Sequence, residues 1–339
     1  MTNIVQDAVT NQQRPTTKTT EGVIAITKDI IDYCGKSASV TGIQINDKRL
    51  IVQGHFITTA HLKDEWYDDV GDPEVIIESL KKCIPAPDIF TFWQRLPDLL
   101  PIYSYCYEWE ALSAIPVKNF RYWWENQIKS DTRKKAKRAE KRGVEITVIS
   151  PDDELINGVM GIFNETPVRR GKPFWHYGKQ FEEVKAMLFA DFARSKYIGA
   201  YDKGSLVGFV KLVFAEERFA NPGFIISTLE ARKKYVNNAL IAKAVELCSD
   251  AGIPYLTYTG WRKGTQAEFL IRNGFQKTLV PRYWIPITKK GAVAIKLGLH
   301  RNVRAYIPEP VMVLLLDLRR SFYSWRYRNN GHESDYQLG

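Results

Sequence analysis

The sequence has few of the residues that build metal sites and disulfide frameworks. Its four cysteines stand far apart and form no C-x-x-C pair: Cys34, Cys83, Cys106 and Cys248. Four of its five histidines have no partner at metal-ligand or catalytic-triad spacing: His55, His61, His300 and His332. We therefore expect reduced thiols, no structural zinc and no metal cofactor.

Long apolar runs are also missing. The longest one spans 311–316, whereas a transmembrane helix needs about 20 apolar residues. Residues 1–20 are polar and lack the apolar stretch of a signal peptide, which predicts a flexible leader. These absences predict a cytoplasmic protein, or one that is peripheral at the inner face of the membrane.

The composition is that of a globular protein. Of 339 residues, 45% are hydrophobic and 25% are charged, which excludes a disordered chain or a low-complexity fibre. The length suggests two domains at about 150 residues per domain. The formal net charge of +10 is concentrated in two places, because 131–143 and 286–339 each carry a net charge of +5. Any anionic partner is expected to meet these two segments.

Patterning divides the chain into five parts. Residues 1–20 are the leader, and 21–118 form a proline-interrupted α+β domain with a hairpin at 43–56 and a helix at 73–82. Residues 119–143 are rich in helix formers and end at Gly143, which predicts one basic connecting helix. Residues 144–288 have the order β-α-α-β-β-β-α-β-α-β, with a last strand at 282–286. Residues 289–339 form a basic tail of two amphipathic helices, broken by Pro308 and Pro310.

The start of the long helix near 237–251 is a candidate anion site. Helix starts that follow a strand in such a mixed sheet suit phosphate groups, because their backbone N–H groups lack partners. Positively charged residues at a helix start are unfavourable unless an anion is bound. The candidate residues, which could equally form a solvated basic loop, are Arg232, Lys233, Lys234, Tyr235, Asn237 and Asn238.

Four segments resemble the GNAT acyltransferase family, in the branch related to Fem-type aminoacyltransferases and polysaccharide-cluster acyltransferases. They are RKKAKRAEKRGV (133–144), TPVRRGKP (166–173), NNALIAKAVELCSDAG (237–252), and YTGWRKGT (258–265) followed by FLIRNGF (269–275). The resemblance covers a little under half of the chain. It implies a mixed central sheet flanked by helices, and the two-domain Fem-type proteins suggest that 21–118 is a reduced second copy, although no internal repeat supports this.

The resemblance implies direct transfer of an acyl group from acyl-CoA, or of an aminoacyl group from aminoacyl-tRNA, to an amine or hydroxyl. The acceptor would be a small molecule or a cell-envelope or polysaccharide precursor. Two family features are absent here: the glycine-containing pyrophosphate loop before the long helix, and the tyrosine acid, whose place is taken by Leu270. Both absences favour the alternative of a non-catalytic adaptor that binds nucleic acid or a membrane-associated complex.

Candidate residues for the reaction follow from these segments. Glu230 is placed to remove the acceptor's proton through water, Tyr258 to replace the missing acid, and His176 to act as a base. The acceptor-side candidates are Arg169, Arg170, Trp261 and Arg262, since an arginine can hold a carboxylate or phosphate with two parallel hydrogen bonds.

The basic segment 133–142 allows three interpretations. A solvated helix tolerates charge on nearly every face. The same charges, preceded by Tyr122, Trp123 and Trp124, would suit tRNA phosphates or anionic lipid headgroups. Aromatic residues among the arginines of the tail would suit either packing on the body or a membrane interface.

Overall fold

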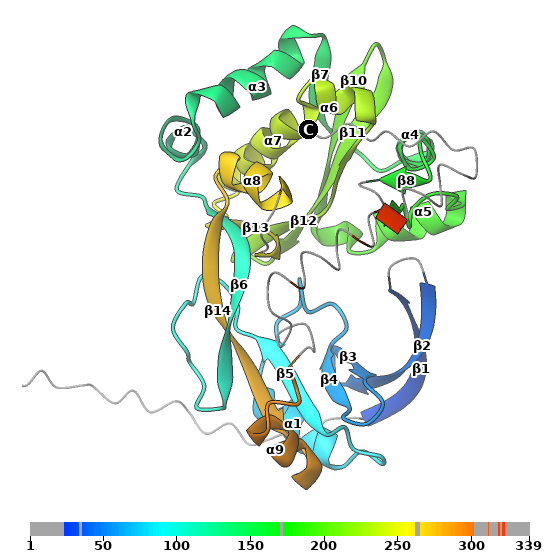
Figure 1. Cartoon of the computed structure of the whole chain (residues 1–339), viewed down its shortest axis with the longest axis vertical. Coiled ribbons are helices and arrows are strands. Elements are labelled where there is room, and N and C mark those ends of the chain that lie inside the picture. The colour runs from blue at the N-terminus through cyan, green and yellow to red at the C-terminus, as the bar shows by residue number, and fades with distance from the viewer. Residues whose placement is uncertain are drawn as a thin grey trace, which may run out of the picture.

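Twelve strands of the described residues form one mixed sheet, in the order β1-β2-β3-β4-β5-β14-β6-β13-β12-β11-β10-β7 (Figure 1). The computed structural model describes residues 24–33, 36–169, 172–261 and 265–301, and residues 311, 318, 321 and 322. The strands of the sheet are β1 (Ile24–Tyr33), β2 (Lys36–Ile45), β3 (Lys48–Gln53), β4 (Thr59–Leu62), β5 (Ile89–Trp93), β6 (Tyr107–Pro116), β7 (Val144–Ile149), β10 (Ser195–Asp202), β11 (Ser205–Ala215), β12 (Phe219–Ser227), β13 (Tyr255–Gly260) and β14 (Gln276–Pro286). A separate ribbon pairs β8 (Val168–Arg169) with β9 (Lys172–Pro173).

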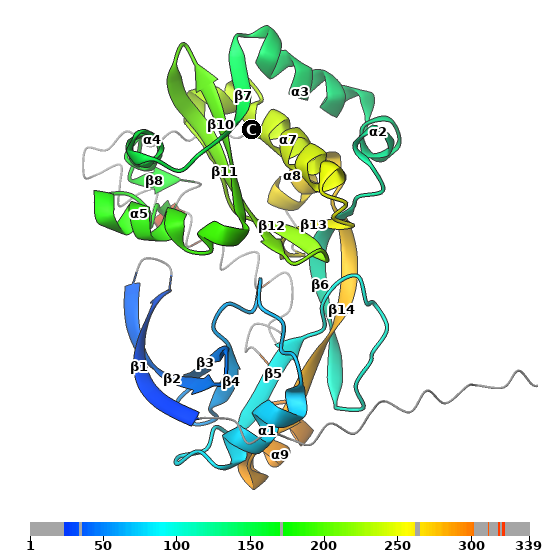
Figure 2. The ribbon, with the colours of Figure 1, turned by 180° about the vertical axis from the view of Figure 1, so that it is seen from behind.

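Helices cover both faces of the sheet (Figures 1 and 2). They are α1 (Pro73–Lys81), α2 (Phe120–Tyr122), α3 (Ser130–Lys141), α4 (Asp153–Phe163), α5 (Phe181–Phe189), α6 (Leu229–Lys233), α7 (Val236–Asp250), α8 (Thr265–Arg272) and α9 (Lys289–Lys296), with a π-helical turn η1 (Trp123–Gln127) and a 3-10 turn η2 (Phe192–Arg194). Strand β11 shows how the layers form. Val210 and Leu212 are fully buried in the core shared with α7, whereas Phe209 is fully buried in the core shared with α4 and α5.

The two parts of the sheet repeat one order of elements. In the C-terminal part, the antiparallel strands β10, β11 and β12 lead into α7 and then into β13, which is parallel to β12. In the N-terminal part, the antiparallel strands β2, β3 and β4 lead into α1 and then into β5, which is parallel to β4. The parts are joined through β14, which lies between β5 and β6.

Most of the predicted elements are confirmed, including the hairpin and the helix at 73–82. The order predicted for 144–288 is also found, except that the ribbon of β8 and β9 lies between α4 and α5 and the short helix α6 precedes α7. The single helix over 119–143 is wrong: it is divided into α2, η1 and α3, because Ile128 is buried and extended (φ −110°, ψ 146°). The last strand begins at Gln276, earlier than predicted. Of the tail, α9 is described, and the second predicted helix lies almost entirely outside the described residues. Within the described residues, no helix combines the length and apolar character of a membrane span.

Helix α9 is anchored to the N-terminal part through Asp88. Thr288 caps α9 by accepting from the Gly291 N–H (3.1 Å), and its hydroxyl donates to Asp88 (2.8 Å). Lys290 forms an ion pair with the same carboxylate (3.0 Å). Gly291 packs so closely that an added Cβ would lie 1.9 Å from the Asp88 carbonyl oxygen. Only a residue without a side chain fits there.

Replacing Gly291 with alanine is expected to lower the free energy of unfolding by about 1–3 kcal/mol, because the contact is with rigid backbone. The matched control is Gly161→Ala in α4, where an added Cβ would meet no atom within 4 Å. That change is expected to raise stability by about 0.5–1 kcal/mol, since alanine favours helix. Urea unfolding of both variants measures the difference, and equal effects would contradict the packing described for α9.

Candidate active site

The candidate site lies where β12 and β13 end. These parallel strands are paired at one position, Ala220 with Leu256, whereas β11 and β12 are paired at eight positions. Near the paired end, the Asn221 amide donates to Thr257 Oγ1 and to the Tyr258 carbonyl oxygen, both at 3.0 Å. Ligands of sheets with parallel strands bind beyond the carboxyl ends of those strands. The segments that follow β12 and β13 are therefore where a ligand is expected to bind.

The corresponding position in the N-terminal part is filled by aromatic side chains. Trp93 ends β5, and Trp66 follows β4; their ring centres are 4.3 Å apart. The Arg282 guanidinium lies over the Trp93 ring at 4.6 Å and pairs with Glu65 (3.2 Å). Because these groups pack against one another, we place the candidate site in the C-terminal part.

The donor-side candidates form one continuous turn between α6 and α7. Tyr235 precedes α7 in the left-handed conformation (φ 66°), which turns the chain sharply. The Arg232 carbonyl oxygen accepts from the Tyr235 N–H (2.9 Å). Lys233 pairs with Glu230 (2.6 Å) and Lys234 pairs with Asp202, so the side chains of both lysines have carboxylate partners.

The two asparagines at the start of α7 have different environments. Asn238 is 8% exposed, and its amide donates to Asn273 Oδ1 (2.9 Å), which ties α7 to the end of α8. Asn237 is half-buried, and its Oδ1 has no hydrogen-bond partner among the described residues. The same holds for the hydroxyl of Ser227, the last residue of β12, which is fully buried. Asn237 and Ser227 thus leave two polar atoms without a partner beside the first turn of α7.

The candidates on β13 and α6 differ in exposure. Tyr258 is half-buried in β13, with its ring centre 6.3 Å from that of Phe275. Trp261 follows β13, and its backbone N–H donates to the Ala111 carbonyl oxygen (2.7 Å). The Glu230 side chain is 77% exposed on α6. Arg262 lies outside the described residues.

Arg169 is buried and joins three elements. Its guanidinium donates to the carbonyl oxygens of Ser227 (2.9 Å) and Ile162 (2.7 Å), at the ends of β12 and α4. It also pairs with Glu165 (3.0 Å), whose carboxylate accepts from the Leu229 N–H at the start of α6 (2.8 Å). Arg169 and Glu165 therefore fix the chain that leads from β12 towards α7. Arg170 lies outside the described residues.

His176 lies in an aromatic cluster on the face of the sheet that α4 and α5 cover. It is 7% exposed and stacks on Phe163, with ring centres 4.5 Å apart. Phe174 and Phe224 contact it edge-on, at 5.3 and 5.5 Å. Since Phe224 belongs to β12, His176 is linked by packing to the strand that ends at Ser227.

The structure thus places the donor-side candidates together at the start of α7, and connects Arg169 to this segment through Ser227 and Glu165. Glu165 and Ser227 were not predicted from the sequence. The four-residue spacing between Glu165 and Arg169 is a signal that could have indicated the pair, whereas nothing in the sequence distinguishes Ser227 from a surface serine.

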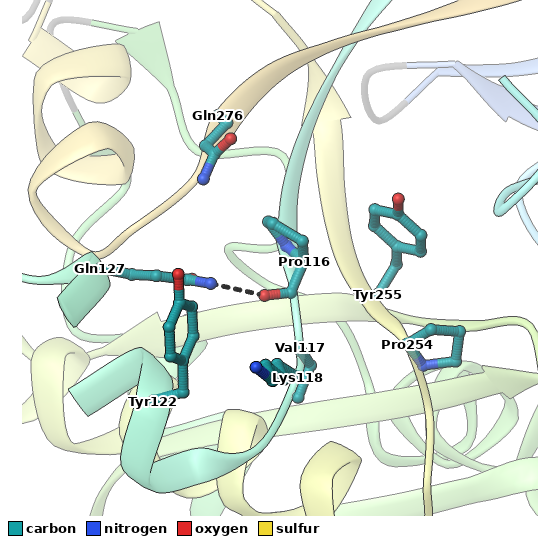
Figure 3. Close-up of a pocket in the computed structure, with 8 residues that line it drawn as sticks. All are labelled: Pro116, Val117, Lys118, Tyr122, Gln127, Pro254, Tyr255 and Gln276. Atoms are coloured by element: carbon teal, nitrogen blue, oxygen red, sulfur yellow. Dashed lines mark hydrogen bonds between the residues drawn. The ribbon is translucent and has the colours of Figure 1, made fainter. Parts of the chain in front are cut away.

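A separate hollow of about 410 Å³ lies at the opposite, amino end of β13 (Figure 3). Its walls come from the end of β6, α2, η1 and the starts of β13 and β14, and are lined by Pro116, Val117, Lys118, Tyr122, Gln127, Pro254, Tyr255 and Gln276. Gln127 donates to the Pro116 carbonyl oxygen (2.8 Å), and both residues line the hollow (Figure 3). It contains none of the predicted site residues.

Comparisons with known proteins give matches of structure. No family model matches, and no curated protein sequence matches. FemX is similar over 80% of this chain and 90% of that chain, with 10% identity and a TM-score of 0.53. The C-terminal domain of a putative lysylphosphatidylglycerol synthetase from Agrobacterium fabrum is similar over 74% and 83%, with 12% identity and a TM-score of 0.51. L-PGS from Bacillus licheniformis is similar over 74% and 84%, with 13% identity and a TM-score of 0.51.

These similarities confirm the predicted fold class, a mixed sheet flanked by helices. At 10–13% identity they concern the arrangement of the chain and not its substrates. The protein has a GNAT-like α+β fold, in an arrangement that it shares with FemX, with the Agrobacterium fabrum domain and with L-PGS.

Proposed function

We propose that this protein is an acyltransferase that moves an acyl group from acyl-CoA, or an aminoacyl group from aminoacyl-tRNA, to an amine or hydroxyl. The observation that carries the proposal is the start of α7 beside the ends of β12 and β13, with two buried polar atoms that lack partners in the part of the chain that the structure describes. A helix start suits the phosphates of a nucleotide-bearing donor. The GNAT-like fold supports the same proposal.

The acceptor would approach from the side of β8, β9 and α5 and could be a cell-envelope or polysaccharide precursor. Its nitrogen or oxygen attacks the acyl carbonyl carbon, and the thioester or ester bond to the donor breaks. We propose that Glu230 takes the acceptor's proton through water, and that Tyr258 returns a proton to the leaving group. His176 remains a candidate base, and Trp261 a candidate contact to the acceptor. Arg169 would act through Glu165 by holding the start of α6 in place.

The repeated order of elements supports a second proposal, that 21–118 is a reduced copy of the same fold. The Trp66–Trp93 pair occupies the corresponding position there. We propose that this copy carries no donor site and serves to complete the sheet.

The donor is expected to raise the melting temperature of the full-length protein. A ligand at 100 times its dissociation constant adds about 2.7 kcal/mol of stability, which corresponds to several degrees. We would compare coenzyme A, acetyl-CoA, longer acyl-CoAs and uncharged tRNA. A shift with an acyl-CoA identifies the donor class, and a shift with tRNA alone indicates aminoacyl transfer. No shift with any of them would contradict the proposal and favour the adaptor.

The Asn237→Asp variant tests whether the donor's phosphates bind at the start of α7. A carboxylate at the half-buried start of α7 is expected to weaken donor binding about tenfold by repelling its phosphates. The fold should remain, since the Asn237 Oδ1 has no partner among the described residues to lose. Asn238 is unsuitable for this test, because the buried bond to Asn273 would be lost. Unchanged donor affinity in Asn237→Asp would place the phosphates elsewhere.

A further inference from the structure

Helix α3 carries positive charge that the described residues do not neutralise. Its buried side, Thr132, Ala136 and Ala139, faces the protein, and the helix lies along α7 (Figure 1). Of the cations at 133–142, Lys135 pairs with Asp131 (2.8 Å), and Arg133 donates to three backbone carbonyl oxygens. The others have no carboxylate partner within the described part of the chain: Lys134, Lys137, Arg138, Lys141 and Arg142.

Three cations of this segment converge on one aromatic ring. The charged groups of Lys135, Arg138 and Arg142 lie 5.8, 5.6 and 5.6 Å from the centre of the Tyr235 ring. They are spaced at i, i+3 and i+7, which places them on one face of the helix. Arg142 is held there by a hydrogen bond to the Lys233 carbonyl oxygen (2.8 Å).

Of the three cations, Lys135 has the Asp131 carboxylate as its partner. The approach of the other two, Arg138 and Arg142, to each other and to the start of α7 is electrostatically unfavourable without an anion. Tyr235 directly precedes α7, so the three cations meet the positive end of the α7 dipole. Contacts with the ring offset part of the repulsion, at about 0.5–1 kcal/mol each for exposed groups. An anion beside the ring would neutralise the cations and the helix end together.

A buried hydroxyl gives a second, independent indication of a ligand. Ser227 is fully buried, and its Oγ has no hydrogen-bond partner among the described residues. A Cβ added at Gly208 would lie 3.1 Å from the Ser227 Cβ and 2.9 Å from Val236 Cγ1, so Ser227 faces the first residue of α7. Buried polar groups are normally hydrogen-bonded, which indicates that the start of α7 is completed by a bound group.

We propose that Lys135, Arg138, Arg142 and Tyr235 form a phosphate subsite for the nucleotide part of the donor, separate from the end that carries the acyl group. The proposal deepens the proposed function and rests on it. The three cations of this subsite belong to α3 and the residue that follows it, whereas Tyr235 belongs to the segment β12-α6-α7. The subsite therefore combines two separate parts of the chain. Arginine binds a phosphate through two parallel hydrogen bonds, as it binds a carboxylate, and the nucleotide part of the proposed donor supplies phosphates. The phosphate could be the 3′-phosphate of coenzyme A or a phosphodiester at the 3′ end of an RNA.

The test is calorimetric titration of the full-length protein with coenzyme A, 3′-dephospho-coenzyme A and a CCA trinucleotide RNA. The variant Arg138→Gln/Arg142→Gln removes two charges beside Tyr235. The matched control Lys134→Gln/Lys141→Gln removes two charges from the same helix, at residues that are not among the three whose charged groups lie over that ring. We expect the first variant to weaken binding about tenfold and the control less than about twofold. The single variant Arg138→Gln keeps the hydrogen bond from Arg142 to Lys233. It therefore tests the loss of charge without the loss of a structural contact.

The outcomes separate the subsite from the proposed function. A loss with coenzyme A that is absent with its 3′-dephospho form assigns the subsite to the 3′-phosphate, and a loss confined to the RNA assigns it to a phosphodiester. Equal losses of affinity in the variant and in its control would overturn the subsite, because they would indicate general electrostatic attraction to the basic helix. Binding that neither variant changes would overturn the subsite and leave the proposed function standing. If no probe binds the unaltered protein, both fail.

Discussion

Replacing Arg169 with methionine is expected to lower the free energy of unfolding by about 3–5 kcal/mol, the usual loss when one partner of a buried ion pair is removed. The carbonyl oxygens of Ser227 and Ile162 would lose their charged donor, and the Glu165 carboxylate would lose its counter-ion. Urea unfolding followed by tryptophan fluorescence measures this loss. Donor affinity should fall as well, because Glu165 holds the start of α6.

The matched control is Arg121→Met. Arg121 also pairs with a glutamate four residues away, Glu125 (3.1 Å), but its side chain is 85% exposed. Exposed pairs of this spacing contribute about 0.3–0.5 kcal/mol. A similar loss of unfolding free energy in the two variants would contradict the role of Arg169 as the buried link between β12, α4 and Glu165.

Replacing Asp88 with alanine is expected to cost about 3 kcal/mol at neutral pH. The carboxylate accepts from the Thr58 N–H (2.9 Å) and hydroxyl (3.1 Å), from Thr288 (2.8 Å) and from Lys290 (3.0 Å). Hydrogen bonds to a charged group contribute more than neutral ones. The loss should release α9 from the N-terminal part, which urea unfolding and limited proteolysis at 289–296 would detect.

The Asp88 effect should depend on pH with a definite sign. Burial acts to raise the pKa of this carboxyl, but hydrogen bonds from Thr58, Thr288 and Lys290 outweigh burial and hold the pKa below its ordinary value. A group whose pKa is lowered on folding stabilises the protein above its unfolded-state pKa, and this contribution fades as the pH falls through the folded-state pKa. The difference between the original protein and Asp88→Ala should therefore shrink below about pH 4. Asp47→Ala, at an exposed carboxylate, is the control and should change little.

Much of the fold was predictable because local patterns determine it. The hairpin at Asn46-Asp47 and α1 after Asp72-Pro73 carry their own turn and cap signals. The break between α2 and α3 could not be predicted, because the burial of Ile128 depends on residues distant in the sequence. The insertion of β14 between β5 and β6 is likewise a long-range choice that no local pattern encodes.

Residue types at the candidate site were easier to predict than their environments. Asn237 and Asn238 are neighbours in the sequence, yet one has an amide oxygen without a partner and the other is tied to Asn273. Arg169 reads as a surface arginine in a loop, but its guanidinium is occupied by backbone carbonyl oxygens and Glu165. Sequence alone cannot separate these cases, since burial follows from packing across elements.

The position of β14 sets the order in which the chain can fold as it is synthesised. Strands β5 and β6 leave the ribosome long before 276–286, yet β14 is the strand that pairs with both of them. Until it arrives, each presents an unpaired edge, and exposed edges are sites of aggregation. The N-terminal part must therefore wait for nearly the whole chain. Versions that end before Gln276 should be captured by chaperones or lost as aggregates, however complete their N-terminal residues are.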